Sequence, residues 1–264
     1  MIAIVGAGKM GEALLAGFLH SGYAPDEVLV TEPRREHALE LQQQFGVEPV
    51  DVRTAAHRAE TLVLAVKPQD IAALLDELAD VVGPHHLVIS VAAGVTTTVV
   101  EKHLGGDVAV IRAMPNTPAL RGVGMTALAG GTQATDEALD RAEQMLCTIG
   151  DVIRVQERHM DTVTAISGSG PAYVYFVAET MVEAGVAMGM PRDIAQRLVS
   201  QTITGAAEML AESGEHPVML REAVTSPGGT TAAAVRELER DGVRAAFTNA
   251  IEAARDRSRQ LSEG

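Results

Sequence analysis

A glycine turn near the start of the chain constrains the fold most. Gly6, Gly8 and Gly11 are spaced as G-x-G-x-x-G, directly after the β-branched run Ile2–Val5 and before a helical pattern. In such a turn the first glycine permits a tight bend, the second lets amides approach a pyrophosphate, and the third lets helix and strand pack closely. We therefore expect a dinucleotide site, although a tight turn without a ligand is an alternative. Its expected contacts are Gly6, Gly8, Lys9, Met10 and Gly11.

Short apolar runs alternate with helical patterns up to about residue 157. Such alternation predicts a mostly parallel sheet covered by helices, an α/β Rossmann-like domain over residues 1–157. The expected strands are Ile2–Val5, Val28–Thr31, Gly46–Val50, Leu62–Val66, Leu87–Val91, Val108–Ile111, Met125–Ala129 and Val152–Val155. The expected helices are Met10–His20, Glu36–Phe45, Ile71–Val82 and Asp136–Ile149.

The second part of the chain, residues 158–264, shows no strand-like alternation. It predicts an all-α domain, and helix hairpins with a wide apolar face often pair with a copy of themselves. We therefore expect a homo-oligomer. The expected helices are Tyr173–Met188, Arg192–Glu212, Thr231–Arg240 and Val243–Leu261.

Composition excludes several function classes. The net charge of −14 argues against nucleic acid as a partner, because nucleic-acid binding needs a basic face. The lone cysteine, Cys147, permits no internal disulfide and no cysteine-based metal cluster, and we expect it to be buried as a small apolar residue. No metal site is expected. No apolar run reaches the length of about 18 residues that a membrane span needs, and no leader is evident, so we expect a cytoplasmic protein without membrane contact.

The end of the second expected strand should determine which nicotinamide cofactor binds. Glu32 could accept hydrogen bonds from a ribose 2′-hydroxyl, which favours NADH. Thr31, Arg34 and Arg35 could instead hold a 2′-phosphate, which favours NADPH. We expect NADPH and leave NADH open.

Two further loops follow expected strands, where ligands bind in open α/β sheets. Ala65, Val66, Lys67 and Pro68 follow the most apolar strand, and Lys67 could meet a cofactor phosphate or cap the loop. Asn116 lies in the stiff, two-proline loop Arg112–Pro118, where substrate positioning and loop architecture are equally compatible with the sequence.

The segment Ser226–Thr231 precedes a helix and combines hydroxyls with glycines. Exposed amides and the positive end of a helix favour a carboxylate ligand, although a plain helix cap is an alternative. No cluster of His, Asp or Cys indicates a nucleophile. A protonated C=N bond accepts hydride without a strong protein acid, so positioning and hydroxyl donors could suffice. The expected substrate contacts are Asn116, Ser226, Gly228, Gly229, Thr230 and Thr231.

Five segments together resemble pyrroline-5-carboxylate reductase over essentially the whole length. They are Gly6–Gly11, Ala65–Pro68, Arg112–Pro118, Ser167–Tyr173 and Ala223–Thr231, and the last two are the most specific. The resemblance implies reduction of 1-pyrroline-5-carboxylate to L-proline, the last step of proline biosynthesis, by NADPH or NADH. It also implies a helical dimerisation domain, a substrate at the dimer interface, and dimers that assemble further into a ring of five.

The same resemblance implies that Thr231 comes nearest to a catalytic side chain. It matches the family threonine that hydrogen-bonds the ring nitrogen or the carboxylate of the substrate. Ala223 stands where some relatives have a cofactor-contacting asparagine. Two alternatives stay open: another Rossmann imine or β-hydroxyacid reductase, and a non-catalytic nucleotide-sensing protein. The former usually places a lysine in the helical domain, but no lysine follows Lys102. The proton donor and the metabolic source of the substrate are not determined by the sequence.

Overall fold

The structure is a computed structural model that describes residues 1–263, and its packing divides the chain into two compact units. The first unit comprises Met1–Ser169 together with the C-terminal segment from Ala254. The second comprises Gly170–Ala253. The boundary expected between residues 157 and 158, where the strand-like pattern ends, stays a prediction.

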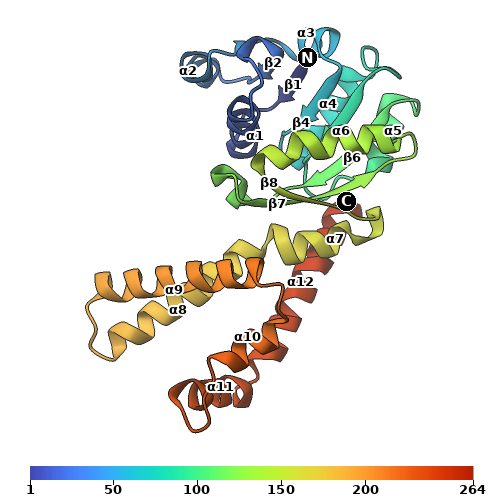
Figure 1. Cartoon of the computed structure of the whole chain (residues 1–264). Coiled ribbons are helices and arrows are strands. Elements are labelled where there is room, and N and C mark those ends of the chain that lie inside the picture. Colours follow the sequence, from blue (N-terminus) through green and yellow to red (C-terminus); the bar gives the residue numbers. More distant parts are fainter. Residues whose placement is uncertain (264) are drawn as a thin grey trace. The chain divides into compact units, whose positions relative to one another are not determined.

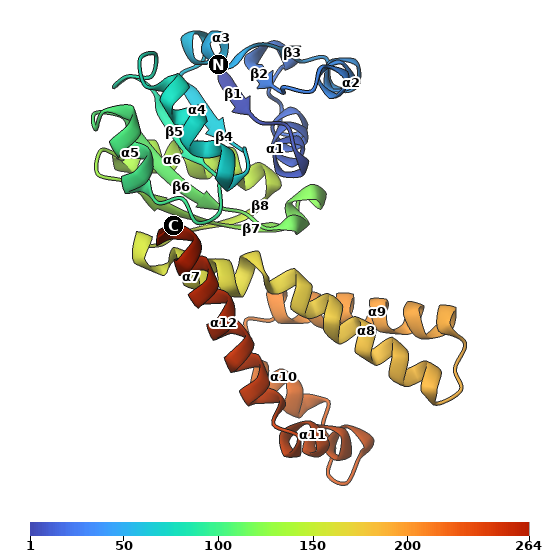
Figure 2. The same cartoon turned by 180° about the vertical axis from the view of Figure 1, so that it is seen from behind.

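Within the described residues the first unit contains one sheet of eight strands in the order β3-β2-β1-β4-β5-β6-β7-β8 (Figures 1 and 2). All neighbours are parallel except β6 and β7. This confirms the predicted α/β fold class. The strands are β1 Ile2–Val5, β2 Val28–Thr31, β3 Glu48–Pro49, β4 Thr61–Leu64, β5 Leu87–Ser90, β6 Ala109–Met114, β7 Gly124–Gly130 and β8 Gly150–Arg154.

Helices cover both faces of this sheet because side chains alternate along each strand. Ile2 and Ile4 point into a core shared with α1, α2 and α6, whereas Ala3 and Val5 point into a second core shared with α3, α4 and α5. Strands buried on both faces therefore appear as continuous apolar runs. The helices of this unit are α1 Lys9–His20, α2 Arg35–Phe45, α3 Val52–Arg58, α4 Ile71–Leu78, α5 Thr97–Leu104, α6 Asp136–Leu146 and α7 Met160–Val163.

Several predicted elements differ from the structure. α3 and α5 were not expected; each begins with a capping side chain, Asp51 accepting from the Thr54 amide and Thr96 accepting from the Val99 amide. The α4 helix ends at Leu78 instead of Val82. The prediction for Cys147 was wrong: its side chain is exposed, because the residue follows the last turn of α6 on the side away from the core.

The second unit is helical, as predicted, and its helices α8 and α9 form an antiparallel hairpin (Figures 1 and 2). Its buried core is small, formed by Val182, Ala195 and Val199 with their neighbours. Large apolar side chains stay exposed on α8, among them Tyr175 at 64% and Phe176 at 68%. The helices are α8 Gly170–Ala187, α9 Arg192–Glu212, α10 Pro217–Ala223, α11 Thr230–Arg240 and α12 Val243–Glu263, which continues into the first unit.

A helix that is apolar nearly all round is normally buried. The exposed face of α8 therefore indicates an association surface, in agreement with the expected homo-oligomer. The short helix α10 was not predicted; Pro217 occupies its first turn and His216 caps it. None of the helices within residues 1–263 combines the length and apolarity that crossing a membrane requires.

Candidate functional site

The glycine turn lies at the point where the strand order reverses. β1 is central, with β2 and β3 on one side and β4 on the other, and the turn leaves the carboxyl end of β1. The Gly6 amide donates to the Thr31 carbonyl at 3.0 Å, and the Ala65 amide donates to the Val5 carbonyl at 2.8 Å. The ends of β1, β2 and β4 are thus held together. In open α/β sheets this edge binds ligands.

The structure gives a different reason for glycine at each of the three positions of the turn. Gly6 has φ +97°, and a Cβ there would lie 2.9 Å from Val66 Cγ1. A Cβ on Gly11 would overlap the Gly6 carbonyl oxygen. A Cβ on Gly8, the N-cap of α1, would meet no atom within 4 Å. Gly6 and Gly11 are therefore required by the fold, whereas Gly8 borders open space.

A cavity of about 650 Å³ adjoins the turn at the end of β2. Its lining includes Gly6, Thr31, Glu32, Arg35 and Val66, so residues from three of the predicted cofactor segments lie together. Carboxylates predominate among the charged groups of the lining. The negative residues are Glu32, Asp51, Asp70 and Glu77, and the positive residue is Arg35. This balance does not favour a 2′-phosphate.

Arg34 does not extend toward this cavity but binds Glu32. Its Nε lies 2.8 Å and its Nη2 3.2 Å from the two carboxylate oxygens, and its amide donates to Oε1 at 3.0 Å. Burial opposes the charge of Glu32, but the hydrogen bonds and charge of Arg34 keep the pKa of that carboxyl below its usual value. Arg34 would have to release Glu32 to hold a 2′-phosphate.

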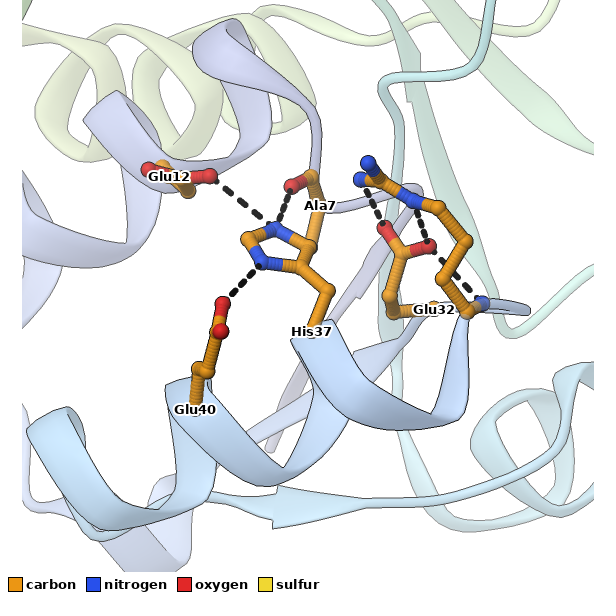
Figure 3. A network of polar contacts seen from close by, with 6 residues as sticks. Ala7, Glu12, Glu32, His37 and Glu40 are labelled. Carbon is orange, nitrogen blue, oxygen red and sulfur yellow. Dashed lines mark hydrogen bonds and ion pairs between the residues drawn. The ribbon is translucent and has the colours of Figure 1, made fainter.

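The sequence analysis missed His37, which lies on α2 beside the glycine turn (Figure 3). Its Nε2 lies 2.8 Å from the Ala7 carbonyl oxygen and 3.0 Å from Glu12 Oε1, and its Nδ1 lies 3.2 Å from Glu40 Oε2. Ala7 is 30 residues away in the sequence. No local pattern could have indicated this contact.

The remaining predicted residues of the first unit lie at strand ends. Val66 packs against Gly6, while Lys67 is exposed and precedes a 3₁₀ turn, Pro68–Asp70. Asn116 follows β6, and all its polar atoms are engaged: Oδ1 accepts from the Met125 amide at 2.9 Å, and Nδ2 donates to the carbonyl and hydroxyl oxygens of Ser167 at 3.2 and 3.3 Å. These bonds favour the architectural interpretation of Asn116.

Ser167 lies in a π-helical turn, Thr164–Gly168, which continues α7. Such turns are rare and often occur at functional sites. A Cβ on Gly168 would lie 2.7 Å from Met114 Cε, so the turn packs closely on β6. Asn116 and Gly168 together attach the specific segment Ser167–Tyr173 to the sheet at its start.

The segment Ser226–Thr231 lies in the second unit, where Gly229 is the N-cap of α11. Gly228 has φ +70°, and the Gly229 amide donates to the Ser226 carbonyl at 3.0 Å. Within the described residues no side chain caps α11. The first amides of a helix have no intrahelical partner, so those of Thr230 and Thr231 remain available to an anion.

Comparisons with known proteins agree across the whole chain. Residues 157–261 match the family model "Pyrroline-5-carboxylate reductase dimerisation", and residues 1–94 match "NADP oxidoreductase coenzyme F420-dependent". The chain is 40% identical to the pyrroline-5-carboxylate reductase of Corynebacterium melassecola and 44% identical to that of Synechocystis sp.. Each alignment covers 99% of this chain and 98% of the relative.

Solved structures give the same result. A pyrroline-5-carboxylate reductase from Coxiella burnetii has a TM-score of 0.94 at 37% identity, covering 99% of this chain and 98% of that one. The Plasmodium falciparum pyrroline carboxylate reductase, solved with NADP bound, has a TM-score of 0.88 at 28% identity, covering 99% and 97%.

Proposed function

The chain belongs to the pyrroline-5-carboxylate reductase family, and we propose that it reduces the C=N bond of 1-pyrroline-5-carboxylate to L-proline with hydride from NAD(P)H. The observation that carries the proposal is the glycine turn, in which Gly6 and Gly11 are packed and Gly8 alone borders open space. This arrangement supports binding of a pyrophosphate, because Gly8 leaves space beside the backbone amides of the turn. The proposed cofactor contacts are those expected from the sequence.

Hydride transfer to a protonated imine needs no strongly acidic side chain from the protein. The cofactor supplies hydride when it is bound, and a protonated imine is already electrophilic. The chain then has to hold the substrate carboxylate and orient the ring. We assign the carboxylate to the amides of Thr230 and Thr231 at the start of α11, with Ser226, Gly228 and Gly229 shaping the segment. The Thr231 hydroxyl would orient the ring nitrogen or the carboxylate.

The deciding assay measures oxidation of NADPH and of NADH after addition of pyrroline-5-carboxylate, with proline identified as the product. We expect turnover that depends on the imine. Binding of cofactor without turnover would instead favour a nucleotide-sensing protein. Oxidation of NAD(P)H with other imines or with β-oxoacids, but not with pyrroline-5-carboxylate, would favour another reductase of this fold.

Cofactor preference is a separate proposal. The exposed Arg35 lines the cavity at the end of β2, and Arg34 could join it after releasing Glu32, which supports NADPH. The four carboxylates of the lining oppose it. If NADPH is preferred, Arg35→Gln should raise the KM for NADPH and leave that for NADH unchanged. Equal effects on both cofactors would reject this role for Arg35.

Self-association completes the proposal. The exposed apolar side chains of α8 support a homodimer, and we propose it as the working state, with assembly of five dimers as the larger form to test. Light scattering on the eluting protein measures the mass directly. A monomer at micromolar concentration would contradict the proposal.

A further inference from the structure

The contacts of His37 favour a particular protonation state. The Ala7 carbonyl and the carboxylates of Glu12 and Glu40 are all hydrogen-bond acceptors, and they lie within 3.2 Å of the two ring nitrogens (Figure 3). A neutral imidazole carries only one N–H, so it must turn a lone pair toward one of these oxygens. Only the doubly protonated ring donates on both sides.

The bond from His37 to Ala7 also orients the next amide. The peptide unit is planar and trans, so the Ala7 C=O and the Gly8 N–H point in opposite directions. With the carbonyl held by His37, the Gly8 N–H points away from α2. Gly8 is the residue of the turn that borders open space. The histidine therefore aims an amide of the phosphate-binding turn.

The same ring lies next to a charge that would oppose an anion. Glu12 is in the first turn of α1, where its carboxylate reduces the attraction of the helix N-terminus for phosphate. The protonated His37 lies 3.0 Å from Glu12 Oε1 and offsets that charge. The orientation of Gly8 needs only the Nε2–H, which one neutral tautomer of the ring keeps, whereas the compensation of Glu12 needs the second proton.

We propose that His37, doubly protonated, is a positioning residue that orients the Gly8 amide and neutralises Glu12, so that the affinity of the chain for a dinucleotide pyrophosphate falls when this proton is lost. The inference rests on the proposed function, since it assumes that the glycine turn binds the cofactor. It assigns to an α2 side chain a part in binding that needs no contact with the ligand.

The charged groups around His37 determine the direction of the pH dependence. Glu12 on α1 and Glu40 on α2 favour the protonated ring, and Arg34, just before α2, disfavours it. The hydrogen bond to the Ala7 carbonyl, followed by that to Glu40, raises the pKa of His37 above its usual value. Protonation of His37 is therefore complete at low pH, and the second proton is lost as the pH rises through this raised pKa. Cofactor affinity should weaken in the same direction.

The test compares His37→Gln with the wild-type protein and with His103→Gln on α5. Glutamine keeps an N–H donor for the Ala7 carbonyl but carries no charge. His103 lies away from the glycine turn, with polar contacts to the Val99 carbonyl and to Asp76. The Kd for NADPH is measured by fluorescence titration from pH 6 to pH 9. The 2′-phosphate titrates in both proteins, so the ratio of the two Kd values isolates His37; NADH, which lacks that phosphate, serves as a second probe.

We expect His37→Gln to bind about fivefold more weakly at pH 6, because it leaves the Glu12 charge uncompensated beside the phosphate and a single charge in the first turn of a helix has an effect of about this size. The Kd ratio should fall toward unity as the pH rises, while His103→Gln matches the wild type throughout. A second variant, Glu12→Gln, should bind more tightly at pH 9 than the wild type does.

A Kd ratio that is independent of pH, with intact binding and unchanged Tm, would overturn the role of the proton and leave the proposed function standing. Failure of the wild-type protein to bind NADPH or NADH would overturn both. The matched Tm matters, because a purely structural histidine would change stability without changing the pH profile of Kd.

Discussion

Gly11 lies so close to the carbonyl oxygen of Gly6 that the two residues exclude any side chain at position 11. Gly8, between them in the turn, is under no such restriction. The motif thus separates into two glycines that the packing requires and one, Gly8, that it does not, which leaves Gly8 as the proposed ligand contact. Mutation can distinguish the two.

Gly8→Val should leave the fold intact and remove dinucleotide binding, because the new side chain occupies the space in front of the amides. We expect the free energy of unfolding to change by about 0.5–2 kcal/mol, the range for N-cap substitutions. Gly11→Ala should instead destabilise by about 1–3 kcal/mol, as overpacking does. Urea unfolding and NADPH titration on both variants check this. Normal cofactor affinity in Gly8→Val would show that the turn is only structural.

Thr231→Val removes the hydroxyl and keeps the shape of the side chain. If that hydroxyl orients the imine, kcat/KM should fall by about 10²–10³. Thr231→Ser, which keeps the hydroxyl, is the matched control and should retain most activity. Steady-state kinetics with pyrroline-5-carboxylate measure both. A loss of less than about threefold in Thr231→Val would reject the assignment.

Asn116→Ala leaves the Met125 amide and the Ser167 carbonyl without their partner. Unsatisfied, partly buried polar groups cost about 1–3 kcal/mol, so the free energy of unfolding should fall by that amount. Ser167→Ala removes only the weaker hydroxyl contact and should cost much less. Unfolding at one fixed chain concentration compares the variants. A catalytic defect at unchanged stability would instead support direct substrate contact by Asn116.

Cys147 should react with a disulfide reagent in the folded protein, because its side chain is exposed. Partial burial, followed by the charges of Glu143 and Asp151, raises the pKa of the thiol. Since the thiolate is the nucleophile, labelling should be slow at neutral pH and accelerate as the pH rises toward that pKa. Absorbance of the released thiol follows the rate, with Cys147→Ser as the blank. Labelling that requires denaturant would contradict the exposure.

Much of this protein follows from local patterns. The run Ile2–Val5, the glycine turn and the order of strands and helices are encoded within short windows, because side-chain periodicity and turn chemistry act between near neighbours in the chain. The specific segments Ser167–Tyr173 and Ala223–Thr231 likewise indicated the family before any fold was known. Short helices such as α3 escaped detection because about two turns leave too little periodic pattern.

Only the tertiary structure decided the contacts between distant residues. His37 reaches Ala7 across 30 residues, and Asn116 reaches Ser167 across 51. It also decided that Arg34 folds back on Glu32 and that Cys147 faces outward. These outcomes depend on how strands are ordered and how helices are rotated on the sheet. Those choices minimise the free energy of the whole core, so no window of the sequence contains them.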